Sequence, residues 1–319
     1  MHQTILRARK QWYYITNFLG LAIPRTFFQF QLEKSLSSPD GTDVENLRRR
    51  VEYYNKLQAP FHVSSAARPL SDFRIAEGSA YFFDLRNILK YFPSSIRVDC
   101  SFGDITQIPR DPSLVKSRPI TDSNQNSILM PFNQIRHFVF VRDPIPFQKK
   151  DDRAIWRGKG IHNQTRRNFV ERHMNQPFCD VGLTDRGLQS HPYYRPFMGI
   201  PEQLRYKFIV SIEGNDVATN LKWIMSSQAL CLMTRPRYET WFMEGTLAPD
   251  VHYVLLKSDY SDLEEKISHY RKNHVDAERI IKNANEFVST FQNPRLERLT
   301  GLMVLEKYLR LSGQHIRQN

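Results

Sequence analysis

The sequence is poor in cysteine and glycine. Its three cysteines, Cys100, Cys179 and Cys231, lie far apart in 319 residues, and none belongs to a C-x-x-C pair. A disulfide framework and a cysteine-based zinc site are therefore not indicated, and we expect a reducing, cytoplasmic environment. With only 13 glycines and 40% hydrophobic residues, the chain can bury a core, which excludes collagen-like and disordered proteins.

Several catalytic signatures are missing as well. The sequence has no G-x-x-x-x-G-K-[ST] loop, no H-E-x-x-H pair and no G-x-S-x-G turn, and Gly158 and Gly160 lack the third glycine of a dinucleotide fingerprint. P-loop enzymes, dehydrogenases and hydrolases are therefore disfavoured. No Asp-x-Asp pair occurs either, so we expect no cofactor and no divalent metal at a nucleotide diphosphate.

Long apolar runs are also absent. The most apolar segment, Trp12–Phe30, is interrupted by Pro24 and Arg25, so it does not reach the roughly 18 apolar residues of a membrane-spanning helix. We expect an ordinary packed helix here. The alternative is a segment that lies in a bilayer interface, since three cations precede it, Arg7, Arg9 and Lys10.

What the chain has in excess is positive charge. Lys and Arg number 45 against 33 Asp and Glu, which gives +12 and a pI near 9.6. Such a balance favours a polyanionic partner, which can be nucleic acid, an anionic membrane or lipopolysaccharide surface, or a phosphate-bearing small molecule. Arg48–Arg50 supports nucleic acid, but no nucleic-acid-binding motif accompanies it, and a charged outer helix face is the simpler interpretation.

The length suits two domains. Two prolines and a charge cluster at Asp143–Asp152 indicate a linker, so we predict an N-terminal domain at 1–150, a C-terminal domain at 151–294 and a C-terminal helix at 295–319 that can pack back on the first domain. Strands are predicted at Ile96–Phe102, His137–Val141, Phe208–Ile212, Ala229–Thr234 and His252–Lys257. Helices are predicted at Ala218–Ser227 and from Leu263 and Asp276 onward. This alternation predicts an α/β fold with a parallel sheet covered on both faces.

Two segments could bind an anion. In the first, a strand end, Gly214 and a helix start follow one another, so the backbone N–H groups of Asn215 to Ala218 can face a phosphate. In the second, Arg157 and Gly158 precede the pair Arg166 and Arg167, whose guanidinium groups can clamp phosphate oxygens. An ordinary β-α turn and a solvated basic loop are the alternatives.

Several of these segments together resemble glycosyltransferase family 90. The resemblance rests on Trp156-Arg157-Gly158 with Arg166 and Arg167, on Lys207 to Lys222, on Glu239 to Phe242, on Pro249 to Tyr253 and on Lys257 to Leu263. It implies a GT-B fold, in which two Rossmann-like domains face a cleft. The first would lie on the acceptor side, and the second would bind the nucleotide sugar. It also implies inverting, metal-independent transfer from a UDP-hexose as co-substrate.

The resemblance implies a donor-binding set as well. Asn220 stands where many relatives carry an arginine, and Glu239 stands where GT-B enzymes use an acid to bind the ribose or the sugar. A helix with an exposed acidic face is the alternative interpretation of Glu239. The implied donor-binding residues are Arg157, Gly158, Arg166, Arg167, Gly214, Asn215, Asp216, Val217, Ala218, Thr219, Asn220 and Glu239.

An inverting transferase needs a carboxylate that takes the proton from the attacking hydroxyl. Asp104 is our candidate for this catalytic base, because it follows the predicted strand Ile96–Phe102 and falls where relatives carry an aspartate. A structural turn aspartate is the alternative interpretation, and Asp99, Asp111 and Asp122 are alternative bases.

The family includes bacterial lipopolysaccharide-core transferases and animal enzymes of the secretory pathway. This sequence shows neither a signal peptide nor paired cysteines, so the bacterial branch fits better. We therefore expect transfer of a hexose to a lipid-linked core oligosaccharide by a cytoplasmic enzyme, peripheral on the inner membrane and attracted to its anionic surface, with no nucleic acid as partner. The competing classes are a basic nucleic-acid-binding protein and an inactive, UDP-binding scaffold.

Overall fold

The chain forms two compact units. The computed structural model describes residues 2–36 and 41–314, and the side chains of 7–32 and 44–314. The C-unit contains His137–Arg237 and Glu244–Thr290, together with the start of α1 (His2–Leu19). The N-unit contains the chain from Arg7 to Arg136, Tyr238–Met243 and the chain from Phe291 onward. The assignment of acceptor and donor binding to domains at 1–150 and 151–294 stays a prediction.

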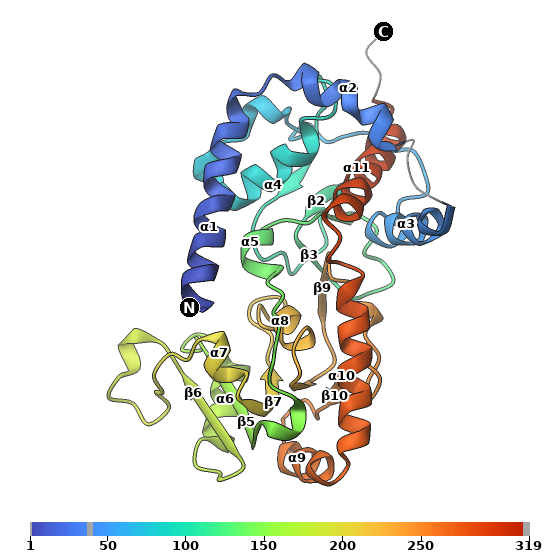
Figure 1. The fold of residues 1–319 in the computed structure, drawn as a ribbon. Helices are drawn as coiled ribbons and strands as arrows, with labels where there is room; N and C mark the ends of the chain where they lie inside the picture. Colours follow the sequence, from blue (N-terminus) through green and yellow to red (C-terminus); the bar gives the residue numbers. More distant parts are fainter. Residues whose placement is uncertain (1, 37–40, 315–319) are drawn as a thin grey trace. The chain divides into compact units, whose positions relative to one another are not determined.

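The C-unit is built on a five-stranded parallel sheet (Figure 1). The strand order is β6-β5-β7-β8-β10, so the first strand of the unit lies in the interior of the sheet. Its successor β6 lies on one side, and all later strands lie on the other. This is one of the common doubly wound orders. The strands are β5 (Asp151–Gly158), β6 (Cys179–Leu183), β7 (Tyr206–Ser211), β8 (Leu230–Met233) and β10 (Val254–Leu255).

Both faces of this sheet are buried. Side chains alternate along a strand, and Trp156 and Phe208 face a core shared with α6, α9 and α10. Ile155 and Ile209 point to the opposite face and are fully buried too. The predicted parallel sheet is therefore confirmed, and the chain is an α/β protein. The helices of this unit are α6 (Gln164–His173), α7 (Ile200–Gln203), α8 (Leu221–Met225), α9 (Leu263–Lys272) and α10 (His274–Ser289).

The N-unit has a smaller parallel sheet surrounded by helices. Its three strands have the order β1-β2-β4, and β3 pairs with β9 in an antiparallel ribbon. The strands are β1 (Cys100–Ser101), β2 (Ser113–Val115), β3 (Ser117–Pro119), β4 (Ser127–Leu129) and β9 (Tyr238–Thr240). The helices are most of α1, α2 (Arg25–Leu36), α3 (Gly41–Tyr54), α4 (Ser79–Leu89), α5 (Gln134–His137) and α11 (Pro294–Leu311).

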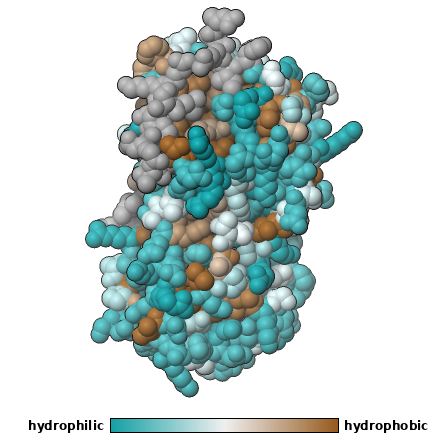
Figure 2. Space-filling model, turned by 90° about the vertical axis from the view of Figure 1, so that its right-hand side faces the viewer, coloured by the Kyte–Doolittle hydropathy of each residue, from teal (hydrophilic) through white to brown (hydrophobic). Residues whose placement is uncertain are grey.

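Short 3-10 turns connect several of these elements. The face of the molecule in Figure 2, which is the right-hand side of Figure 1, is mostly hydrophilic, and its hydrophobic residues form small separate areas. The 3-10 turns lie at Gly20–Ala22, Leu70–Asp72, Ile75–Glu77, Phe147–Lys149, Arg186–Leu188 and Glu244–Thr246.

Four of the predicted elements differ from the structure. The strands predicted at Ile96–Phe102 and His252–Lys257 are each reduced to two residues, those of β1 and β10. The strand predicted at His137–Val141 is wrong, because His137 ends α5 and Phe138–Val141 has no regular structure. The Val141 N–H donates to the Ser226 hydroxyl at 3.0 Å instead of to a strand. The helix predicted at Ala218–Ser227 is reduced to the five residues of α8, since the residues before Leu221 form a turn and not a helix.

Candidate active site

The loops that follow β5 and β7 meet at the carboxyl edge of the five-stranded sheet. The two strands are neighbours, but the chain leaves β5 for β6 on one side, and it leaves β7 for β8 on the other. In open α/β sheets such a change of direction leaves a crevice at the carboxyl ends of the strands, and ligands bind there. Residues 159–163 and 212–220 are therefore the candidate ligand-binding loops of the C-unit.

Arg166 joins these two loops from the first turn of α6. Asn163, the N-cap of this helix, accepts a hydrogen bond from the Arg166 backbone N–H at 3.0 Å and donates to the Gly214 oxygen at 3.2 Å. The Arg166 side chain is half-buried, so its positive charge lies at the carboxyl edge of the sheet. Its guanidinium donates to three backbone oxygens, those of Lys159 at 2.8 Å, Ile212 at 3.0 Å and Glu213 at 3.1 Å.

The other two predicted arginines are directed to different partners. Arg167 donates to Gln164 within α6. Arg157, on β5, donates to the carboxylate of Asp180 at 2.6 Å and to its backbone oxygen at 2.8 Å, across to β6. Of the three arginines, Arg166 is thus the one that the structure brings to both candidate loops. The phosphate-binding role of each stays a prediction.

The glycines of the first loop make room for the protein's own side chains. A Cβ atom on Gly158 would lie 2.7 Å from the Trp156 ring, and one on Gly160 would lie 2.6 Å from Leu183. Both distances are shorter than a Cβ contact allows. At these two positions the missing side chain therefore serves the packing of the protein's own side chains.

The loop after β7 is fixed at its far end by Asn220. Its amide donates to the Val210 oxygen at 3.1 Å and accepts from the Ser211 hydroxyl at 3.1 Å. Asp216, Val217 and Ala218 are buried, while Gly214, Asn215, Thr219 and Asn220 are half-buried or exposed. The half-buried and exposed residues form the accessible surface of the loop. Donor binding by the residues of this loop stays a prediction.

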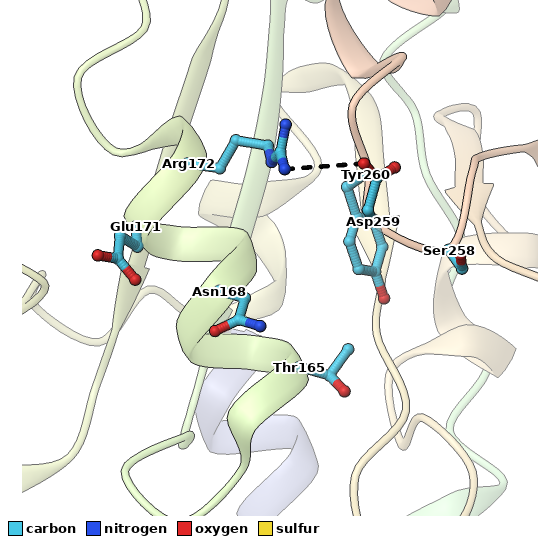
Figure 3. Close-up of a pocket in the computed structure, with 7 residues that line it drawn as sticks. All are labelled: Thr165, Asn168, Glu171, Arg172, Ser258, Asp259 and Tyr260. Atoms are coloured by element: carbon cyan, nitrogen blue, oxygen red, sulfur yellow. Dashed lines mark ion pairs between the residues drawn. The ribbon is translucent and has the colours of Figure 1, made fainter.

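A pocket of about 550 Å³ opens beside α6 (Figure 3). Arg172 and Asp259 face each other across it at 3.7 Å. Tyr260 has φ +59, which is rare for a residue with a side chain. Its backbone oxygen accepts a hydrogen bond from the ring of His173 at 3.1 Å. The lining residues are Thr165, Asn168, Glu171, Arg172, Ser258, Asp259 and Tyr260.

Sequence reasoning assigned this pocket no function. The signal that could have indicated it is the polar run around Tyr260, directly after the predicted strand that became β10. Burial raises the pKa of Tyr260 to about 12, so its phenol is neutral at physiological pH. Unusual backbone geometry of this kind is common at functional sites.

In the N-unit, Asp104 lies at the carboxyl edge of the three-stranded sheet. It follows β1 after Gly103, whose φ of +111 gives the chain a turn that glycine favours. Lys116, which directly follows the neighbouring β2, forms an ion pair with the Asp104 carboxylate. The lysine side chain is 2% exposed and that of Asp104 is 32% exposed. The carboxylate is therefore held by a buried cation and remains partly exposed to solvent.

The alternative bases have different surroundings. Asp99 is buried and accepts hydrogen bonds from the Ser64 hydroxyl at 2.6 Å and the Ser64 N–H at 3.0 Å. Asp111 and Asp122 are exposed residues in turns. Asp104 combines exposure, a fixed loop and a place at a sheet edge, and its role as base stays a prediction.

Glu239 lies on β9 in the N-unit and is buried. It pairs with the equally buried Arg118 at 2.7 Å and accepts a hydrogen bond from the Tyr53 hydroxyl. Arg118 also donates to the Ser127 oxygen at 3.0 Å. The carboxylate thus belongs to an internal network, and the predicted contact with the donor is untested.

Two observations concern metals and thiols. Within residues 2–36 and 41–314, no group of three or more His, Cys, Asp or Glu side chains is arranged to hold a metal ion. Burial raises the pKa of the Cys179 thiol to about 12 and that of Cys231 further. Both thiols are therefore protonated at physiological pH and are poor nucleophiles.

Comparison with known proteins gives the class of this protein, which is a glycosyltransferase. The family model described as glycosyl transferase family 90 matches residues 131–308. The chain is 46% identical over 265 residues to O-glucosyltransferase LpsA of Dichelobacter nodosus, with 83% of each chain covered. It is 27% identical over 169 residues to human protein O-glucosyltransferase 3, and the aligned residues cover half of this chain and 32% of the human protein.

The chain therefore belongs to glycosyltransferase family 90, and the resemblance seen in its motifs is confirmed. The family match covers all five strands of the C-unit sheet and the loops that Arg166 joins. Asp104 lies outside the matched range, so its assignment depends on the geometry of the N-unit and on the resemblance.

Proposed function

We propose that this enzyme transfers glucose from UDP-glucose to a hydroxyl group of a lipid-linked surface oligosaccharide, with a lipopolysaccharide core as the acceptor class. The observation that carries the donor half is the position of Arg166 at the change of direction between β5 and β7. The bacterial and human relatives are both named O-glucosyltransferases, which supports glucose as the sugar. The higher identity to the bacterial relative supports a bacterial glycan as acceptor.

The diphosphate would bind at the N-terminus of α6. This ten-residue helix starts at the crevice, and the N–H groups of its first turn carry a partial positive charge. Arg166 adds a full charge at the same place, and charge-assisted hydrogen bonds from a guanidinium are among the stronger ones to phosphate oxygens. In this proposal the protein's own cations neutralise the leaving diphosphate, so the reaction needs no metal.

Asp104 would act as the catalytic base. An acceptor hydroxyl oxygen attacks the anomeric carbon of glucose, the bond from that carbon to the diphosphate oxygen breaks, and UDP leaves with the electron pair. The hydroxyl proton passes to the Asp104 carboxylate. One displacement inverts the configuration at the anomeric carbon. Lys116 would hold the carboxylate in place through its ion pair.

We further propose the GT-B arrangement for the whole enzyme. The C-unit would hold the donor and the N-unit the acceptor, each at the carboxyl edge of a parallel sheet. A lipid-linked acceptor would place the enzyme peripherally on the cytoplasmic face of the inner membrane. The described residues contain no helix long and apolar enough to cross a bilayer.

Ligand-dependent thermal unfolding tests the donor half. UDP should raise the melting temperature more than ADP or GDP does, since a ligand that binds the folded state stabilises it. Single-stranded RNA should leave it unchanged. Stabilisation by RNA and not by UDP would favour the nucleic-acid-binding alternative, and stabilisation by UDP without any turnover would favour the inactive scaffold.

A further inference from the structure

The exposed apolar side chains of this protein are concentrated near its N-terminus. Among the described residues, twelve large apolar side chains are exposed, and eight of them lie between Trp12 and Phe30. Trp12 is 68% exposed and Phe30 is 89% exposed. A concentration of exposed large apolar side chains within one short segment indicates a binding surface. The eight residues, which we call the apolar surface, are Trp12, Ile15, Phe18, Leu19, Leu21, Ile23, Phe27 and Phe30.

On α1, polar side chains bond to α4, and the rings of Tyr14 and Phe18 pack against Phe83, while other apolar side chains face outward. The Tyr13 hydroxyl donates to the Asp84 carboxyl at 2.8 Å, and Asn17 accepts from Asn87 at 2.7 Å, both on α4. Trp12, Ile15 and Leu19 follow helical spacing on the opposite side. A helix that buried all its apolar side chains on a core would leave no such row exposed.

The same arrangement continues into α2. Arg25 donates to the Phe92 oxygen at 2.8 Å, and Gln29 donates to the same oxygen at 3.0 Å. Phe28 is buried against the N-unit, whereas Phe27 and Phe30 are exposed. Polar contacts therefore fix both helices to the N-unit and leave the aromatic rings outside.

The charged side chains of the segment that carries the apolar surface are all positive. The sequence contains no Asp or Glu before Glu33. Arg7, Arg9 and Lys10 lie on the exposed part of α1, next to Trp12. A segment with exposed aromatic rings, cations and no acids of its own matches an anionic lipid surface, into which the rings insert while the cations meet the headgroups.

We propose that the apolar surface binds an anionic lipid bilayer and orients the enzyme on it. The inference rests on the proposed function, in that a lipid-linked acceptor must be reached from the membrane plane. A second copy of the chain fits less well, because a two-fold contact would bring the same cations to both sides with no acid of this segment to pair with. The helices lie in the interface and do not cross the bilayer.

Co-sedimentation with lipid vesicles tests this inference. The full chain should bind vesicles of phosphatidylethanolamine and phosphatidylglycerol. It should bind pure phosphatidylcholine vesicles at least about tenfold more weakly, because anionic lipid attracts the cations. The variant Trp12→Ser/Phe27→Ser/Phe30→Ser should bind the anionic vesicles at least about tenfold more weakly, since three rings no longer insert.

Exposed apolar residues elsewhere provide the matched control. Phe197 and Val275 are 73% and 81% exposed in the C-unit, and Phe197→Ser/Val275→Ser should bind vesicles like the unchanged protein. Circular dichroism and the melting temperature should be the same for all three proteins, because the replaced side chains are exposed. Unchanged binding of the triple variant, or no binding by the unchanged protein, would overturn the proposal.

Two further measurements distinguish bilayer binding from self-association and from donor binding. Light scattering would reveal a dimer that the triple variant abolishes, and such a dimer without vesicle binding would assign the apolar surface to a contact between copies. UDP-dependent thermal stabilisation should be equal in the triple variant and the unchanged protein. Vesicle binding without UDP binding would support bilayer binding by the apolar surface and would contradict only the proposed function.

Discussion

At the scale of single residues, Asp104 differs from the other candidate aspartates by its ion pair with a buried lysine. Asp104→Asn removes the negative charge and the proton acceptor but keeps the size of the side chain. We expect the rate of UDP release with acceptor to fall by roughly a hundredfold or more, since general base catalysis contributes this much. UDP affinity, measured by calorimetry, should stay the same.

Asp111 supplies the matched control for this experiment. It is an exposed aspartate in a turn of the same unit, so Asp111→Asn should keep the full rate. Equal rates for Asp104→Asn and the unchanged enzyme would exclude Asp104 as the base and would leave Asp122 as the exposed alternative.

Asp84 is a second residue with a distinct chemical state. Burial raises the pKa of its carboxyl from 3.8 to about 7, although hydrogen bonds from Tyr13 and Gln134 act in the other direction. Below about pH 4 the carboxyl is protonated in the folded and the unfolded chain. Above it the unfolded chain loses the proton first, so the free energy of unfolding should fall as the pH rises from about 4 to about 7.

Urea unfolding at pH 4, pH 5.5 and pH 8 checks this expectation by comparison with Asp84→Asn, which cannot ionise. The unchanged protein should lose more stability over this range than the variant, because only it carries the Asp84 titration. Parallel pH profiles of the two proteins would show that Asp84 does not titrate between the folded and unfolded states as described.

At the scale of elements, the N-terminal turn of α6 connects the loops after β5 and β7. Arg166→Lys keeps the charge and loses the planar set of donors that holds both loops. We expect UDP affinity to fall by about ten- to a hundredfold, since a hydrogen bond to a charged group contributes about 1.5 to 3 kcal/mol. Arg167→Lys, one position along the same helix, should change UDP affinity little, because Arg167 contacts Gln164 instead.

Calorimetry with UDP distinguishes the two variants, and their melting temperatures report any loss of stability from the loop contacts. A larger effect of Arg167→Lys than of Arg166→Lys would assign the diphosphate to Arg167 and would contradict the place proposed for it at the sheet edge.

Packing of the loop after β5 leads to a stability prediction. Gly160→Ala puts a methyl group 2.6 Å from Leu183 and 3.0 Å from Arg166, which the neighbours can only relieve by moving. We expect about 1 to 3 kcal/mol of destabilisation in urea unfolding. Gly187→Ala is the control, since nothing lies within 4 Å of the added atom. Equal stability of both variants would show that the loop adapts without cost.

The elements with strong local patterns were predictable from the sequence. The apolar runs that became β7 and β8, and the helical spacing from Leu263 and from Asp276, gave elements of the right type and place. The run Phe138–Val141 misled, because an apolar β-prone run becomes a strand only where a neighbouring strand accepts it. The outward-facing apolar side of α1 was not predictable either, since periodicity shows a face and not what covers it.

The candidate site was predictable in its types of residue and less so in its contacts. Arg157 and Arg166 are equally good candidates from the sequence. Only the fold shows that Arg157 pairs with Asp180 on β6, whereas Arg166 joins two loops. Glu239 is an isolated acid in the sequence, but Arg118 lies 121 positions earlier in the chain and pairs with it. Such pairings depend on tertiary contacts that spacing does not encode.

At the scale of the whole molecule, the charge of +12 is divided among different tasks. Arg166 lies at the proposed donor site, and Arg7 and Lys10 border the apolar surface. Arg50 is buried and pairs with Glu297 at 2.6 Å, so Arg48–Arg50 is not one exposed basic patch. The triplet that favoured nucleic acid is therefore partly a structural contact between α3 and α11.

Transfer itself is the most direct test of the central claim. The protein is incubated with UDP-glucose and a truncated lipopolysaccharide core, the product is analysed by mass spectrometry and nuclear magnetic resonance, and released UDP is measured. We predict an acceptor that has gained one hexose in β linkage and an equal amount of UDP. An unmodified acceptor under conditions where UDP binds, or a product in α linkage, would contradict the account of this protein as an inverting glucosyltransferase.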